Sequence, residues 1–281
     1  MKEHVEAFKK LDLKTNPVKE IEKIISQIGA LPVAITDFDK SKIIHRARPI
    51  KEGENLTSAD QLSFTPKELN SEYRRASTPE QTMFYGAVIP EIIGEKEIKL
   101  ERIIGACETS KFLRDANSPD GEEIIVFGKW RVKDKISLLS IINPEVEKNK
   151  ISFFQEMTNN YHLFLESIKE KKESAELFQS FLSSEFAKLV IKGQEYDYLI
   201  TSKFTEEIIK QCDGVIYPSV RAGYNGLCVA IKPETANANL ELVEVSECLI
   251  TKRNNHVTIQ NLRYTDKIEN GKFELTEINA T

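Results

Sequence analysis

The sequence predicts an α+β protein. Apolar residues recur at helical spacing over 17–28 and from about 151 to 211. Most other apolar runs are short, rich in β-branched and aromatic residues, and bounded by turn formers, which is typical of strands. No Pro-, Gly- or Ser-rich linker divides the 281 residues, so we expect one mixed domain preceded by an N-terminal extension.

The N-terminal extension, residues 1–39, is expected to be helical. Asn16 suits the N-cap of a helix and Pro17 suits its first position. Gly29 suits the position just after the last turn. A helix is therefore predicted over 17–28.

Strands predominate over 40–281. The expected strands are 42–50, 82–89, 122–132, 135–142, 215–217, 227–231, 240–254 and 256–278, with an earlier one at 31–38. Helical spacing predicts a helix over 98–113 and a helical insertion at about 151–190. The region of about 240–281 is expected to be a β-rich tail with an Asn-Gly hairpin turn near its end.

The composition excludes several classes of function. The net charge of −5 argues against nucleic acid or an acidic membrane surface as a partner, because both attract a basic face. The four cysteines, Cys107, Cys212, Cys228 and Cys248, lack the spacing of a zinc site or a disulfide framework. The charged N-terminus does not resemble a signal peptide, and no apolar run is long enough to span a membrane. We expect a cytoplasmic protein without a metal.

Two arginines and a tyrosine lie where strands are expected to be apolar. Arg46 and Arg48 alternate within 42–50 and therefore share one face of the strand. Either that face is solvated, or the two guanidiniums bind phosphate, for which their planar forks are well shaped. Tyr85 is either a core residue with a satisfied hydroxyl or an aromatic surface for a planar ligand.

A glutamate and one strand connection add further polar groups. Glu108 lies four positions after an apolar residue of the predicted helix, so it is expected to point inward. A carboxylate in that place is unfavourable unless it is paired or functional. The connection within 214–231 carries Ser219, Arg221 and Asn225, although a simple turn between two strands needs none of these groups.

Four segments resemble, in chain order, the motifs of the RES-domain family. HRARP looks like its arginine motif, ACETS like its glutamate motif, and DGVIYPSVRAGYNGLCVAI like its serine motif. RRASTPEQTMFY matches the pattern GRxNxxGxxxxY and keeps the step from Arg75 to Tyr85 without a gap. The resemblance covers roughly 40–235. It implies an ADP-ribosyltransferase-like fold, in which a mixed, split β-sheet surrounds a cleft.

The resemblance also implies a reaction. Characterised RES-domain proteins are toxins of toxin–antitoxin pairs, and they cleave the nicotinamide–ribose bond of NAD. This chain is thus expected to be an NAD glycohydrolase or NAD phosphorylase, with NAD as substrate and no further cofactor. An antitoxin protein and a second copy in a homodimer are the partners that the resemblance suggests. Two alternatives stay open: an ADP-ribosyltransferase acting on a protein acceptor, and a catalytically inactive nucleotide-binding or interaction module.

The residue types suit this chemistry. Cleavage passes through an oxocarbenium-like ribose, so the protein must supply an anion near the sugar and cations near the diphosphate. The resemblance implies that Glu108 is the anion near the sugar and that Arg46 and Arg75 are the cations near the diphosphate. It places Tyr85 against the nicotinamide ring or its ribose, and Ser219 against that ribose. Further substrate-binding candidates are Arg48, Arg221 and Asn225.

The chain also departs from the family pattern. RRAS replaces the usual GRWN-like start, so that Arg74 stands where the family has glycine. The chain adds about 40 residues at its front and the helices near 151–190. These additions are expected to cap the cleft, to mediate oligomerisation, or to restrain the enzyme as an antitoxin does elsewhere.

Overall fold

The computed structural model describes residues 1–30, 32–88, 100–114, 119–141, 152–191, 193–221, 226–254 and 256–278. The helices are α1 (Lys2–Lys9), α2 (Val18–Ile28), α3 (Leu100–Thr109), α4 (Lys111–Arg114), α5 (Ser152–Ser167), α6 (Lys172–Phe186), α7 (Leu199–Ile208) and α8 (Pro233–Asn239). The strands are β1 (Ile35–Phe38), β2 (Ile43–Pro49), β3 (Phe84–Val88), β4 (Gly121–Val132), β5 (Ile136–Ser140), β6 (Gly214–Pro218), β7 (Leu227–Ile231), β8 (Leu240–Arg253), β9 (His256–Thr265), β10 (Ile268–Glu269), β11 (Lys272–Phe273) and β12 (Thr276–Glu277). The expected α+β class is confirmed.

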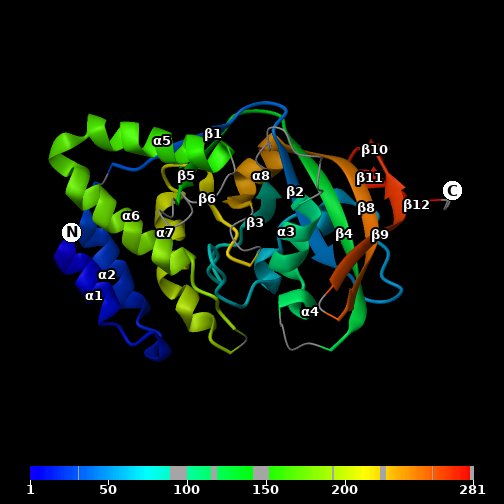
Figure 1. Ribbon diagram of the computed structural model, residues 1–281, viewed down its shortest axis with the longest axis horizontal. Helices are drawn as coiled ribbons and strands as arrows, with labels where there is room; N and C mark the ends of the chain where they lie inside the picture. Colours follow the sequence, from blue (N-terminus) through cyan, green and yellow to red (C-terminus); the bar gives the residue numbers. More distant parts are fainter. Residues whose placement is uncertain are drawn as a thin grey trace.

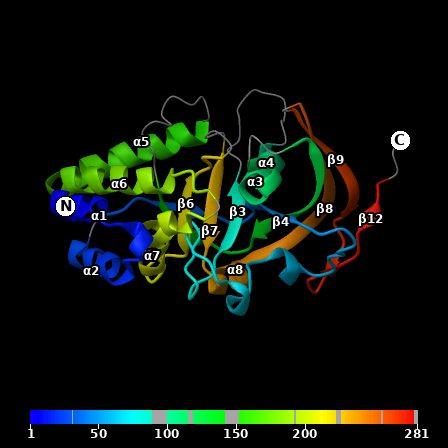
Figure 2. The same cartoon turned by 90° about the horizontal axis from the view of Figure 1, so that it is seen from below.

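A ten-stranded mixed sheet organises the fold, in the order β1-β5-β6-β7-β3-β2-β4-β8-β9-β12. β5 and β6 are parallel, whereas the other neighbours are antiparallel. Helices α1, α2, α5, α6 and α7 gather at one end of the molecule, and β8, β9 and β12 form the other end (Figure 1). The view from below shows α3 and α4 over the middle of the sheet (Figure 2).

The join between β2 and β3 is the least extensive in the centre of the sheet. β2 pairs with β4 from Ile43 to Pro49, and β3 pairs with β7 along its whole length. β2 and β3, by contrast, meet in register only where His45 lies opposite Ala87. Away from this pair of residues, β2 and β3 are not paired in register. Backbone carbonyl and amide groups of the two strands are therefore available to side chains.

Gly86 sits beside this join because a larger residue would not fit. A Cβ added there would lie 2.3 Å from Cγ2 of the fully buried Ile44 and 3.3 Å from the carbonyl oxygen of His45. We expect Gly86→Ala to lower the free energy of unfolding by about 2 kcal/mol through overpacking, measured by chemical denaturation. Adding Ile44→Ala should recover part of the loss from Gly86→Ala, and a strictly additive pair would argue against this contact.

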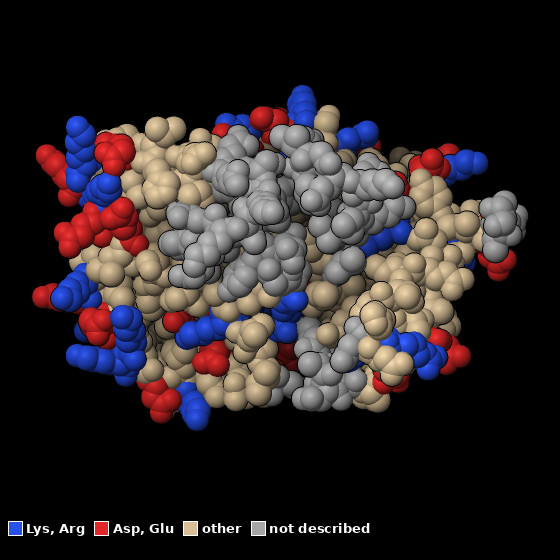
Figure 3. Space-filling model, in the orientation of Figure 1, with Lys and Arg blue, Asp and Glu red and all other residues tan. Residues whose placement is uncertain are grey.

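Apolar side chains fill both faces of the sheet. One face carries Phe84, Val88, Leu227 and Val229, which pack with Trp130 and with residues of α5. The other face packs against the helices; its buried residues include Val5, Ile24, Ile104, Phe181, Phe204, Val215 and Ala230. Charged side chains of both signs are interspersed over the coloured surface in Figure 3. Among the described residues, no helix is long and apolar enough to cross a membrane.

The predicted N-terminal helix is confirmed, but the observed helix begins one residue later than predicted. Pro17, rather than Asn16, occupies the N-cap, and Asn16 has a left-handed backbone with φ 55°. Gly29 follows the last residue as expected, with φ 68°. The extension also supplies β1, which pairs with β5 at one edge of the sheet. The region 1–39 thus contributes to the sheet as well as to the helices.

Candidate functional site

A buried hydrogen bond joins two of the predicted site residues. Ser219 follows β6 directly and is fully buried, and its Oγ donates to Oε1 of Glu108 at 2.6 Å. Glu108 lies near the C-terminal end of α3, with its side chain 21% exposed. The two residues are 111 positions apart in the sequence. The fold therefore brings the glutamate and serine motifs together.

Backbone contacts hold this pair in place. The Ser219 amide donates to the carbonyl oxygen of Gly226 at 2.8 Å, which ties the end of β6 to the start of β7. Gly226 in turn lies against Ile104 of α3, where an added Cβ would be 2.0 Å from Cδ1 of the isoleucine. A side chain at position 226 would displace the Ile104 side chain, so glycine suits this close approach to α3. This approach places Ser219 within reach of Glu108.

Arg221 contacts the other oxygen of the same carboxylate. Its Nε lies 3.8 Å from Oε2 of Glu108, and its Nη2 donates to the carbonyl oxygen of Val190 at 3.0 Å. The Arg221 side chain is 11% exposed. Glu108 is thus held between a hydroxyl and a guanidinium, and one of its sides remains open to solvent. The carboxylate is positioned rather than freely mobile.

Two cysteine thiols lie close enough to feel this carboxylate. Burial raises the pKa of Cys228 well above its usual value, and the charge of Glu108 acts in the same direction. Burial and Glu108 also raise the pKa of Cys107. Since a cysteine attacks as its thiolate, both thiols are poor nucleophiles at neutral pH. The chemistry of this site belongs to the carboxylate and the hydroxyl.

Tyr85 of β3 is anchored by the RRAS turn. Its hydroxyl oxygen accepts from the Ala76 amide at 3.0 Å and lies 2.8 Å from Oγ of Ser77. Burial raises the pKa of the phenol. The half-buried ring packs with the helical side of the core. The motif that departs from the family pattern thus still supports the tyrosine.

Removing the Tyr85 hydroxyl tests this support. Tyr85→Phe leaves the buried Ala76 amide and the Ser77 hydroxyl without their shared partner, so we expect a loss of about 1–2 kcal/mol in the free energy of unfolding. Thermal denaturation monitored by circular dichroism would measure it. Tyr264→Phe, in an outer strand, is the matched control and should change stability by less than about 0.5 kcal/mol. Equal stability of the two variants would contradict the anchoring role.

Arg46 of β2 bridges the join between β2 and β3. Its Nη1 donates to the carbonyl oxygen of Tyr85 at 2.7 Å, and its guanidinium lies over the Phe84 ring at 5.2 Å. Burial, followed by the charge of Arg74, lowers the pKa of Arg46 to about 10, so it remains a cation at pH 7. Among the described residues, no hydrogen bond or ion pair joins Arg46 to Glu108.

Three other predicted substrate-binding residues have different surroundings. Arg48 donates from Nη2 to Oε1 of Glu54 at 2.6 Å and from Nη1 to the carbonyl oxygen of Gln61 at 2.7 Å. Arg75 is 6% exposed; its Nη1 donates to the Phe186 carbonyl and its Nη2 to the Lys188 carbonyl at 3.1 Å. Neither arginine is brought together with Glu108. Asn225 lies outside the described residues.

Sequence reasoning treated Arg74 as a departure from the family pattern at the entrance of the site and did not name it among the substrate-binding residues. Its side chain is exposed and makes no hydrogen bond or ion pair with any residue in the described ranges. The available signal was the replacement of glycine by arginine beside the motif. The structure gives the two adjacent arginines opposite surroundings, since Arg74 is exposed and Arg75 is buried.

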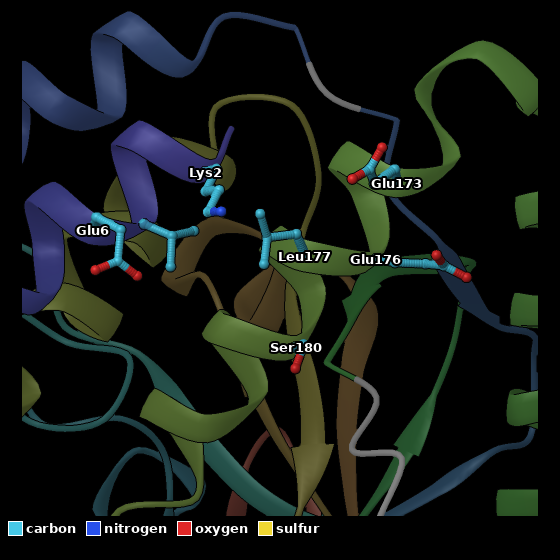
Figure 4. Close-up of a pocket in the computed structure, with 7 residues that line it drawn as sticks. Lys2, Glu6, Glu173, Glu176, Leu177 and Ser180 are labelled. Carbon is cyan, nitrogen blue, oxygen red and sulfur yellow. The ribbon is translucent and has the colours of Figure 1, made fainter.

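A hollow lies elsewhere, between α1 and α6. Figure 4 shows Lys2 and Glu6 on one side and Glu173, Glu176, Leu177 and Ser180 on the other. None of the predicted site residues lines it. Its acidic rim is unsuited to a diphosphate, so we place the candidate site at Glu108 instead.

Comparisons with known proteins give no family for this chain. No protein-family model matches it, and no curated protein matches it significantly. Within the described ranges, no group of three or more His, Cys, Asp or Glu side chains is arranged to hold a metal ion.

Proposed function

We propose that this protein cleaves the nicotinamide–ribose bond of NAD, as a glycohydrolase or a phosphorylase. The observation that carries the proposal is the hydrogen bond between Ser219 and Glu108, which unites the two residues that give the resembled family its catalytic motifs. The proposal includes an ADP-ribosyltransferase-like arrangement, with the limited join between β2 and β3 as the place where the sheet opens toward the ligand.

The reaction needs little acid–base help from the protein. Nicotinamide leaves as a neutral molecule because its ring nitrogen loses its positive charge when the bond breaks. Positive charge then develops on the ribose, as in glycoside cleavage. A carboxylate fixed before the reaction stabilises this charge without reorganising. Glu108 meets that need, since Ser219 and Arg221 hold both of its oxygens.

The neighbouring groups have supporting roles in the proposal. Arg46 binds the diphosphate, because it is a cation with unused donors beside the open join. Tyr85 shapes the ribose or nicotinamide end of the site from the adjacent strand. Ser219 positions the glutamate through the hydrogen bond that its hydroxyl donates. Water or phosphate then accepts the ADP-ribosyl group.

The test is to incubate the purified chain with NAD, with and without phosphate, and to follow free nicotinamide by chromatography. Release of nicotinamide by the wild type, and its loss in Glu108→Gln, would support the proposal. Whether the release requires phosphate identifies the acceptor of the ADP-ribosyl group. A folded protein that releases no nicotinamide under either condition would contradict it. Thermal stabilisation by NAD without release would then favour the nucleotide-binding module.

A further inference from the structure

Arg46 has more donor capacity than its surroundings use. A guanidinium has five N–H groups, and Arg46 uses Nη1 for the Tyr85 carbonyl. Its Nε is buried and has no hydrogen-bond partner among the described residues. A buried, unsatisfied donor on a cation is unfavourable. Such a group calls for an acceptor that the described residues do not provide.

Arg74 is held beside the same place. Its turn is closed by two backbone hydrogen bonds with Ser77, at 2.9 and 3.2 Å. The Ser77 hydroxyl lies 2.8 Å from the Tyr85 hydroxyl, while the Tyr85 carbonyl accepts from Arg46. Tyr85 thus connects the two arginines, one on β2 and one on the turn before β3. Arg74 itself is exposed and unpaired among the described residues.

Within the described ranges, no carboxylate forms an ion pair with either of these two cations. The charged groups that act on Arg46 are Arg74, Arg48 and the Tyr85 phenol, and both arginines disfavour its charged form. Arg48 is neutralised by Glu54, whereas Arg74 has no such partner in the described part of the chain. The region therefore carries two positive charges that repel each other near the join between β2 and β3. An anion would relieve their repulsion and satisfy the unused donors of Arg46.

We propose that Arg46 and Arg74 form an anion site in which Arg74 binds a terminal phosphate group, carried by the dinucleotide or free beside it, in addition to the diphosphate of NAD. The inference rests on the proposed function for the role of Arg46 at the diphosphate. Each phosphate of a diphosphate diester carries a single charge. A monoester carries nearly two charges at neutral pH and offers three oxygens to guanidinium donors. Arg74 is therefore a specificity-determining residue.

Two sources of this chemistry fit the site. One is a 2′-phosphate on the dinucleotide, as in NADP; the other is free inorganic phosphate bound beside NAD. The two are distinguished by probes that contain no nicotinamide bond and cannot be cleaved. Suitable probes are ADP-ribose, 2′-phospho-ADP-ribose and inorganic phosphate, with affinity measured by calorimetry and thermal shift on the full chain.

Arg74→Ala is the decisive variant, since an exposed, unpaired side chain can be removed without unfolding the protein. If the 2′-phosphate is the source, 2′-phospho-ADP-ribose should bind the wild type about tenfold more tightly than ADP-ribose, and Arg74→Ala should abolish that preference. If free phosphate is the source, phosphate itself should bind, and Arg74→Ala should weaken it about tenfold. Arg131→Ala, which removes a charge on β4 that is paired with Glu241, is the control and should leave both affinities unchanged.

The inference is overturned if Arg74→Ala changes neither affinity, or if it weakens ADP-ribose and 2′-phospho-ADP-ribose equally and leaves phosphate unaffected. Its failure differs from a failure of the proposed function, because these measurements report binding and not nicotinamide release. An Arg74-dependent phosphate site in a protein that releases no nicotinamide would refute only the cleavage reaction.

Discussion

Glu108→Gln is expected to reduce the rate of nicotinamide release by about 10³-fold. Glutamine keeps the size of the side chain and an oxygen that can accept the hydrogen bond from Ser219. It removes the negative charge that stabilises the developing oxocarbenium ion, and loss of one such preorganised group lowers kcat by roughly 10²–10³-fold or more. The fall should appear mainly in kcat, because positive charge develops on the ribose only as its bond to nicotinamide breaks.

The control for this substitution is Glu234→Gln on α8, which makes the same chemical change at an exposed position. Its kcat and its thermal midpoint should match those of the wild type. Full activity of Glu108→Gln would show that the carboxylate does not stabilise the transition state. A fall in KM and kcat together with a large loss of stability would instead indicate that Glu108 mainly supports the packing of α3.

Much of the fold could be predicted because local patterns decide it. The strand over 42–50 is observed as β2, and the strand over 82–89 as β3. The predicted Asn-Gly turn joins β10 and β11. α8 was missed because it has only seven residues and begins at a proline after a buried strand, so it has no clear helical period.

The candidate site was predictable only in part. Glu108 and Ser219 belong to different segments, and only their tertiary placement brings them within 2.6 Å. Sequence position also assigned Arg75 to the substrate. The observed partners of Arg75 lie in a segment more than 100 residues later in the chain, since Arg75 binds carbonyl groups at the end of α6. No local pattern contains that information.

The structure predicts that Arg75 stabilises the fold, whereas the sequence analysis assigned it to substrate binding. Arg75→Ala is expected to lower the free energy of unfolding by about 3–5 kcal/mol, measured by chemical denaturation. The substitution leaves the carbonyls of Phe186 and Lys188 without their donors. It also opens a cavity beside the rings of Tyr198 and Tyr217, which lie 5.3 and 5.9 Å from the guanidinium.

Arg74→Ala is a closely matched control, because it makes the same change one residue away at an exposed side chain. It should alter the free energy of unfolding by less than about 0.5 kcal/mol. If Arg75 instead bound substrate, Arg75→Ala would fold with wild-type stability and show a raised KM for NAD. Equal stability of the two alanine variants would therefore support a substrate-binding role for Arg75. It would contradict the stabilising role of its hydrogen bonds to the end of α6.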